Sequence, residues 1–395
     1  MCFSKHLNNF GTYESNNEKL ISLKNELENL RLLHEDSKIE NILQQIEIVK
    51  YNLQKDNCLD INTINLVLSE KLKIPAKQIV FDDNEKFLHL EETLIENFAG
   101  HSKILKDIAN CIKRNRQGYD INDNKPIGTF LFSGPSGIGK STLALELSKI
   151  LFNSESNIVT LNMSEYTDSS SINKIYGYQS NSLINENNSL FSKINKMPYC
   201  VLVLDNIEKA HNSIIDLFSQ ILDKGAIKDY NDKVISFSNI IIIATTTVGI
   251  NTLKTLSKEN LIDCLNSNEY ENILLSELKN VLDSEFINRF DLRLFFRPIT
   301  ELNDIAKLLS KQLTKIIAKI KEKNNLELIF TETSCDYLMY KSMQCNCLDG
   351  ARPIFRIIDS LVLDELMNFL MNNEIGSNKN ILYDYCNNKI KIELF

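Results

Sequence analysis

The stretch that decides the fold reads Gly134, Pro135, Ser136, Gly137, Ile138, Gly139, Lys140, Ser141 and Thr142. Its first eight residues fit the pattern GxxxxGK[ST] in full, between the apolar run GTFLFS (128–133) and the predicted helix STLALELSKILF (141–152). A glycine-rich turn in this position directs backbone N–H groups at an anion, and the helix dipole favours the same charge. The pattern therefore predicts a phosphate-binding loop, in which Lys140 reaches the β- and γ-phosphates of ATP and the Ser141 hydroxyl binds Mg²⁺.

Three further apolar runs alternate with helical stretches, namely NIVTLNM (157–163), YCVLVLD (199–205) and SNIIIIAT (238–245). Near-continuous apolar runs are typical of strands buried on both faces of a parallel sheet. One run ends in Asp205, which is placed to hold the hydration shell of Mg²⁺ beside the phosphate loop. Capping of the following helix is the alternative role for this carboxylate. The fold class is α/β, a P-loop ATPase module with a parallel sheet flanked by helices.

The rest of the chain is predicted to be mostly helical. Near the N-terminus, leucines recur every three or four residues, at Leu20, Leu23, Leu27, Leu30 and Leu33. This helical spacing favours a helical hairpin or a short coiled coil. Beyond Pro298, helices are expected over 304–323, 335–341 and 353–371, before a closing strand at 388–395. These patterns divide the chain into a helical arm at 1–57, a connector at 58–95, a large nucleotide-binding domain at 96–297 and a smaller, mostly helical lid domain at 298–395.

Composition excludes several classes of protein. Of 395 residues, 43% are hydrophobic and 24% charged, which is ordinary globular usage. No run of 18 apolar residues and no secretory leader occur, so a soluble, non-secreted protein without a membrane span is expected. A net charge of −8 argues against nucleic acid as a partner. Nine scattered cysteines favour reduced thiols in a reducing compartment over disulfides or zinc.

Several segments carry a resemblance to a known family. They are KPIGTFLFSGPSGIGKSTLALELS (125–148), LNMSEY (161–166), MPYCVLVLDNIEKAHNSI (197–214), SQILDKGAI (219–227), SEFINRFD (284–291) and DGARPIF (349–355). From about Cys58 to the C-terminus the chain resembles the second ATPase module of the Clp unfoldases (ClpA, ClpB and ClpC), which are AAA+ ring proteins, and the module is ClpC-like. Residues 1–57 are interpreted as a remnant of the middle coiled-coil region of that family.

The resemblance implies a hexameric ring with ATP bound between subunits, either of this chain alone or with a related Clp subunit. Arg289, in FINRFD, stands at the arginine-finger position, which reaches the γ-phosphate of the neighbouring subunit. Arg352, in GARP, matches the second-sensor arginine, which couples the bound nucleotide to lid movement. The implied substrates are unfolded polypeptides, and a Clp protease is an implied partner.

Three positions depart from the family pattern. Asn206 follows Asp205 where the family has glutamate, and an amide is not a useful base for the attacking water. Thr247 stands at the first-sensor position, where the family usually has asparagine, and threonine has the shorter reach. The pore segment KIYGYQSNSLINEN (174–187) lacks the family's Gly-Tyr-Val-Gly loop. Tyr176 and Tyr178 are the candidate gripping aromatics, although a gap-free count puts Ser182 at that place.

Two interpretations stay open at this stage. The first is an ATP-dependent protein-remodelling ATPase, with hydrolysis weakened by Asn206. The second is a hydrolysis-deficient subunit that binds nucleotide and stabilises or regulates a mixed ring. A DNA-handling AAA+ protein is disfavoured by the charge and by the Clp segments.

Because Clp proteins have two ATPase modules and this chain has one, it is a one-module relative or part of a split gene. A plastid-type stroma, including that of an apicoplast, or a bacterial cytoplasm is the expected compartment.

Overall fold

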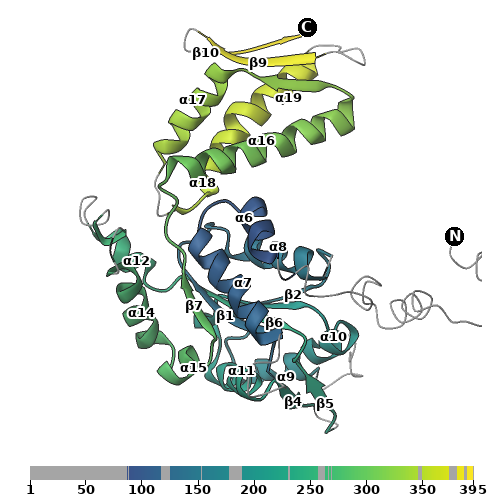
Figure 1. Ribbon diagram of the computed structural model, residues 1–395, viewed down its shortest axis with the longest axis vertical. Coiled ribbons are helices and arrows are strands. Elements are labelled where there is room, and N and C mark those ends of the chain that lie inside the picture. The colour runs from purple at the N-terminus through teal and green to yellow at the C-terminus, as the bar shows by residue number, and fades with distance from the viewer. Residues whose placement is uncertain are drawn as a thin grey trace, which may run out of the picture. The chain divides into compact units, whose positions relative to one another are not determined.

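The computed structural model describes residues 87, 89–116, 125–152, 154–177, 189–229, 232–256, 263–265, 267, 269–345, 349–372, 380–386 and 389–394 (Figure 1). All of them belong to one compact unit, Asp82–Phe395. The predicted helical arm at 1–57 and most of the predicted connector at 58–95 lie outside the described residues. Within the described part, no helix is long and apolar enough to cross a membrane.

A five-stranded parallel sheet forms the centre of the large domain (Figure 1). In spatial order its strands are β2 (Ile158–Asn162), β3 (Val201–Asp205), β6 (Ile241–Thr246), β1 (Gly128–Ser133) and β7 (Leu292–Phe295). The four apolar runs of the sequence predict β1, β2, β3 and β6, and the structure confirms them. The sequence does not predict β7, because its short run is interrupted by the charged residues Asp291 and Arg293.

The strand order places the candidate site residues at one edge of the sheet. Strand β6 pairs in parallel with both β1 and β3, so the carboxyl ends of all three strands point the same way. The phosphate loop follows β1, Asp205 ends β3, and Thr247 directly follows β6. In open α/β sheets this carboxyl edge is where ligands bind.

Helices cover both faces of the sheet. Successive residues of β1 enter different cores, because side chains alternate across a strand: Phe130 and Phe132 pack on one face and Leu131 on the other. The first face carries α6 (Leu90–Asn97), α7 (Ser102–Arg116) and α8 (Lys140–Phe152). The second carries α9 (Ile172–Tyr176), α10 (Leu190–Lys196), α11 (Asn212–Lys224) and α15 (Ser284–Asn288).

Smaller elements complete the large domain. The hairpin β4 (Ala226–Lys228) and β5 (Val234–Ser236) follows α11. Helices α12 (Ile250–Lys254) and α14 (Glu269–Val281) enclose a separate small core around the fully buried ring of Tyr270.

The C-terminal domain combines helices with a small sheet (Figure 1, green to yellow). Its elements are α16 (Leu302–Asn324), β8 (Glu327–Phe330), α17 (Glu332–Met343), α18 (Arg352–Ile358), α19 (Asp364–Asn372), β9 (Asn380–Cys386) and β10 (Lys389–Leu394). Strand β9 pairs with β10 antiparallel and with β8 parallel. The helices and the closing strand agree with expectation, but the sequence did not predict β8, which has only four residues, or β9, whose apolar run is interrupted by Asp384. A π-helical turn, Asp359–Leu363, separates α18 from α19 within the single helix expected there.

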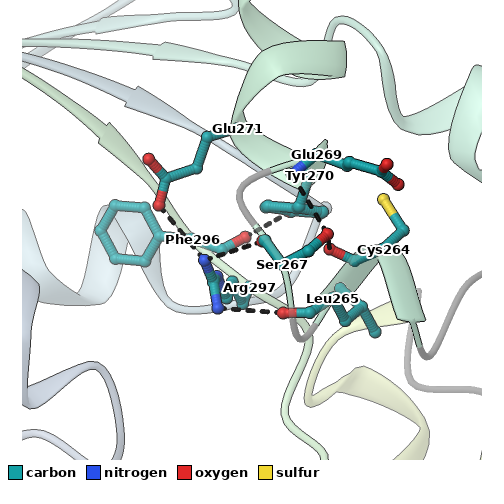
Figure 2. A network of polar contacts seen from close by, with 8 residues as sticks. All are labelled: Cys264, Leu265, Ser267, Glu269, Tyr270, Glu271, Phe296 and Arg297. Atoms are coloured by element: carbon teal, nitrogen blue, oxygen red, sulfur yellow. Dashed lines mark hydrogen bonds and ion pairs between the residues drawn. The ribbon is translucent and has the colours of Figure 1, made fainter.

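A polar network holds the linker that joins the two domains (Figure 2). Arg297 donates a hydrogen bond to the backbone oxygen of Leu265 at 2.9 Å. The hydroxyl of Tyr270 donates to the backbone oxygen of Phe296 at 2.6 Å, and the N–H of Phe296 donates to the oxygen of Ser133 at 2.7 Å. Since Ser133 is the last residue of β1, the linker to the small domain starts beside the phosphate loop.

Candidate active site

The phosphate loop closes around the side chain of Lys140, the first residue of α8. Its Nζ donates to the backbone oxygen of Gly134 at 2.7 Å and to that of Pro135 at 2.8 Å, and 8% of the residue is exposed. Burial lowers the pKa of Lys140 to about 8, although the charges of Glu208 and Asp205 oppose this shift. The ammonium therefore lies inside the loop on neutral acceptors, which phosphate oxygens can replace.

The small domain contacts this loop through Gly350, Ala351 and Arg352. The N–H of Ala351 donates to the backbone oxygen of Gly137 at 3.0 Å. Gly137 has a φ of +76°, and a Cβ added there would lie 2.7 Å from Cγ of Arg352. Gly350 has a φ of +69°, and its added Cβ would lie 2.6 Å from the backbone oxygen of Ser136. Both positions require glycine, and the side chain of Arg352 lies directly against the loop.

Asp205, at the end of β3, is held by neutral donors. The hydroxyl of Thr245 donates to its Oδ1 at 2.6 Å, and Nδ2 of Asn206 donates to its Oδ2 at 3.2 Å. The backbone N–H of Asn206 in turn donates to Oγ1 of Thr245 at 3.1 Å. Asn206 itself adopts the left-handed conformation, with φ 57° and ψ 58°, which asparagine tolerates better than most residues. The amide at this position thus orients the neighbouring carboxylate.

The donor set at this edge fits a Mg²⁺ ion. The carboxylate of Asp205 and the residue Ser141 line the same cleft, and Mg²⁺ prefers one or two such oxygen ligands together with substrate phosphates. Dedicated all-protein cages are uncommon for this ion, so two protein ligands are enough for such a site. Asp205 and Ser141 would hold the ion, which would neutralise charge on the phosphates.

Thr247, at the predicted first-sensor position, is bound to Glu208. Its backbone N–H and its hydroxyl both donate to Oε1 of Glu208, each at 3.2 Å. Thr247 lines the cleft, whereas Glu208 is not among the lining residues. The sequence contained Glu208 in the segment that follows Asp205, but nothing in its spacing indicated this pairing.

A cleft of about 680 Å³ brings most of the candidate residues together. Its lining includes Ser136, Gly137, Ile138, Gly139, Lys140, Ser141, Thr142, Asp205, Asn206, Thr247 and Arg352. Sequence reasoning missed the other walls, which are apolar beside the loop (Phe98, Ile299, Leu308 and Phe355) and polar along α16 (Lys311, Gln312 and Lys315). An apolar wall next to a phosphate loop suits a nucleotide base. Of these residues only Phe355, the last residue of DGARPIF, lies in a segment that the sequence singles out, because folding gathers the others from separate segments.

Three predicted site residues do not line this cleft: Gly134 and Pro135, which begin the phosphate loop, and Arg289. Arg289 follows α15 at the helix C-cap, and its guanidinium lies 2.9 Å from the carboxylate of Asp223 and also pairs with Glu285. Its side chain is 21% exposed. The place of Arg289 outside its own cleft is compatible with action on a neighbouring subunit, which stays a prediction.

Comparison with known proteins agrees with this geometry. The family model described as "AAA domain (Cdc48 subfamily)" matches residues 125–293, and the model described as "C-terminal, D2-small domain, of ClpB protein" matches residues 301–383. Together they match more than half of the chain, in the order that the structure has its two domains. The chain belongs to the Clp family of AAA+ ATPases. It carries the second ATPase module of that family, as the sequence motifs predicted.

Relatives within the Clp family cover most of the chain. The chaperone protein ClpB of Malacoplasma penetrans is 33% identical over 356 residues, which are 90% of this chain and 48% of the relative. The chloroplastic ClpB2 of Oryza sativa is 31% identical, over 80% of this chain and 32% of the relative. The ClpA homologue of Cyanidium caldarium, an ATP-binding subunit of the ATP-dependent Clp protease, is 32% identical, over 83% of this chain and 39% of the relative. The chain thus spans about half or less of the length of these relatives. ClpC-like character stays a prediction.

One candidate for the pore aromatic of a Clp ring, Tyr176, lies among the described residues and is partly buried. The ring of Tyr176 packs edge-on against Phe191 of α10, with centroids 4.8 Å apart, and it joins the core beneath the sheet. The role of Tyr176 in a pore stays a prediction. The other two candidates, Tyr178 and Ser182, lie outside the described residues.

Proposed function

We propose that this chain is a Clp-type chaperone ATPase subunit that binds Mg·ATP and hydrolyses it slowly. The arrangement of Lys140 inside the loop, with Asp205 and Ser141 on the same cleft, supports nucleotide binding. The observation that carries slow hydrolysis is the hydrogen bond from the Asn206 amide to Asp205. A glutamate at position 206 would supply a carboxylate for the attacking water, whereas the amide has no basic atom at neutral pH.

The subunit would act in a ring, either with copies of itself or with a related Clp subunit. Arg289 would then reach the nucleotide of the neighbouring subunit, after exchanging its pairs with Asp223 and Glu285 for a phosphate. Unfolded polypeptides are the proposed substrates, and a Clp protease is a proposed partner. A reducing compartment such as a plastid stroma or a bacterial cytoplasm is proposed as its location.

A second function is favoured by the same amide. If turnover is absent, the chain would be a nucleotide-holding structural or regulatory subunit of a mixed ring. ATP would then stabilise assembly by mass action, while partner subunits supply the hydrolysis.

Steady-state ATP turnover of the natural protein tests these functions, beside Lys140→Ala and Asn206→Glu. Turnover above the Lys140→Ala background, and faster in Asn206→Glu, is expected for the slow ATPase. If the natural protein shows no ATP turnover and Asn206→Glu does, the structural subunit would be favoured. Nucleotide binding, followed by fluorescence of a labelled ADP, and assembly, followed by sedimentation, provide the controls. A protein that binds no nucleotide and does not associate would contradict both functions.

A further inference from the structure

A groove of about 300 Å³ lies on the small domain, between α16 and the helical stretch that runs from α18 through the π-helical turn into α19 (Figure 1). Its floor is apolar and includes the buried side chains of Ile316, Ile320 and Ile358. Along α16 the groove extends from Gln312 to Asn324, which is about 18 Å at the rise of an α-helix. A groove of this length accommodates about three turns of a second helix.

One wall of the groove is a strip of three lysines on α16, Lys315, Lys319 and Lys323, which are spaced four residues apart. All three are exposed, and their ammonium groups make no ion pair and no hydrogen bond with another described residue. Lys321, on the same helix, does not line the groove and pairs with Glu327 at 3.9 Å. In a chain with a net charge of −8, the lysine strip is a local excess of positive charge, which favours an acidic partner.

The opposite wall of the groove is mostly apolar. Phe355, Leu363 and Met367 contribute to it, and Asp359 is the acidic residue that lines it among the described residues. Residues four apart drift by about 40° around an α-helix at each step, and the wider π-helical turn, Asp359–Leu363, opposes this drift. These side chains therefore stay on one side of the helix, and Met367 is 42% exposed.

An amphipathic helix fits a groove with this arrangement. Helices that bind in grooves place apolar side chains on the floor at every third or fourth residue. Acidic side chains along one flank of such a helix would meet the lysine strip at the same helical spacing. The other flank would meet Leu363 and Met367, so it would be apolar. A flat anionic surface would reach the lysines but not the isoleucine floor.

The groove adjoins the nucleotide cleft. Gln312, Lys315 and Phe355 line both the groove and the cleft. Phe355 belongs to the apolar wall that suits a nucleotide base, so a helix packed against its ring would restrict the side chain that the base contacts. A side chain that is already ordered costs less to bind, and coupling of this kind is reciprocal between the two ligands.

We propose that the groove between α16 and α18–α19 binds an acidic amphipathic helix of a partner protein, and that this partner tightens nucleotide binding through Phe355. The helix has about three turns, with apolar residues at its centre and acidic residues on the flank that faces α16. The docking step stands apart from the proposed function, whereas the coupling step rests on the proposed binding of nucleotide.

Binding of helical peptides to the full chain tests the docking step. The probe is a synthetic peptide of about 14 residues, with leucine at every third or fourth position and glutamate along one flank. Its control carries lysine in place of each glutamate. Fluorescence anisotropy is expected to show that the acidic peptide binds about tenfold more tightly, since each of three exposed ion pairs changes the affinity about twofold.

Charge reversal in the lysine strip provides a matched pair of variants. Lys319→Glu is expected to weaken the acidic peptide about fivefold and to strengthen the lysine peptide, because repulsion replaces attraction at the centre of the strip. Lys321→Glu, outside the groove on the same helix, is expected to change neither. On the apolar wall, Met367→Ala is expected to weaken the acidic peptide about threefold. Met371→Ala is its control, because Met371 is 84% exposed and does not line the groove.

Titration of fluorescent ADP, with and without the acidic peptide, tests the coupling. The Kd for ADP is expected to fall about fivefold when the peptide is bound, and the Kd for the peptide should fall by the same factor in the presence of ADP. Lys319 lines the groove but not the cleft, so Lys319→Glu is expected to keep the Kd for ADP that the natural protein has without peptide.

Equal binding of the acidic peptide by the natural protein and by Lys319→Glu would overturn the docking step. Equally tight binding of polyglutamate would also overturn it, because charge alone would then account for the affinity. Self-association in sedimentation that Lys319→Glu abolishes would assign the groove to a second copy of this chain instead of a partner. Bound peptide with an unchanged Kd for ADP would overturn the coupling. A protein that binds the peptide but no ADP would contradict the proposed function and support the docking step.

Discussion

The two sides of the nucleotide cleft differ in how closely they follow the Clp pattern. On the phosphate side, β1 and α8 hold Lys140 inside a complete loop, and Ala351 of the small domain bonds to that loop at Gly137. On the hydrolytic side, β3 is followed by Asn206 and β6 by Thr247, and both residues depart from the pattern. Because the two sides are carried by different strands, one can change while the other keeps its geometry. The proposed binding of ATP and its proposed hydrolysis are therefore expected to be separable, and four predictions test that separation.

Removing the charge of Lys140 should have the largest effect. Lys140→Met is expected to raise the Kd for ATP about 100-fold, because hydrogen bonds to charged groups contribute about 1.5–3 kcal/mol each. Lys149→Met is the matched control, since Lys149 lies on the same helix and lines the same cleft but is 56% exposed and pairs with Glu155. Titration with fluorescent ADP measures nucleotide affinity in both variants. Similar losses in the two variants would show that the cleft responds to charge in general.

Pushing the small domain away from the loop should have the next largest effect. Gly350→Ala places a Cβ against the backbone oxygen of Ser136 at a φ of +69°, and is expected to lower the free energy of unfolding by about 2 kcal/mol and to weaken ATP binding. Gly225→Ala shares the strain, with a φ of 62°, but lies at the end of α11 away from the cleft. Urea denaturation and ATP titration of the two variants distinguish the effect of backbone strain from the effect of the lost contact between the small domain and the loop. Equal ATP affinity in the two variants would argue against coupling through this contact.

Raising the pH should weaken binding without any mutation. Burial lowers the pKa of Lys140 to about 8, so the ammonium that binds phosphate is present below pH 8 and is lost as the pH rises through that value. Between pH 7 and pH 9 the affinity for ATP is expected to fall about tenfold, since one pH unit beyond a pKa leaves about a tenth of the protonated form. Calorimetry in buffers of different ionisation enthalpy should detect proton uptake on binding near pH 8. An affinity that stays level over this range would contradict the shifted pKa.

The smallest effect concerns the backbone on the hydrolytic side. Asn206 has a φ of 57°, and both Asn206→Gly and Asn206→Ala remove its amide. The alanine variant is expected to be less stable than the glycine variant by about 1 kcal/mol, because only glycine adopts this conformation without cost. Urea denaturation compares them directly. Equal stabilities would show that the turn after β3 relaxes, and that Asn206→Glu gains a carboxylate at no conformational cost.

The sequence predicted most where one chemical signal was strong and local. Four apolar runs predicted four of the five strands of the central sheet, and the glycine-rich pattern predicted the loop between β1 and α8. The sequence did not predict β4, β5, β7, β8 and β9. These strands are short or carry polar residues, so their pairing with other strands decides that they form. The sequence also missed the π-helical turn within the last long helix, because helical periodicity does not reveal one inserted residue.

The sequence alone thus determined that this chain is an α/β P-loop module with its phosphate loop, its Asp205 and its departures at Asn206 and Thr247. Only the tertiary structure decided that Glu208 binds Thr247, that Ala351 bonds to Gly137, and that residues of α16 line the cleft. The physical reason is distance along the chain. A motif records neighbours in sequence, whereas a hydrogen bond across 39 residues or a contact from another domain depends on how strands and helices pack.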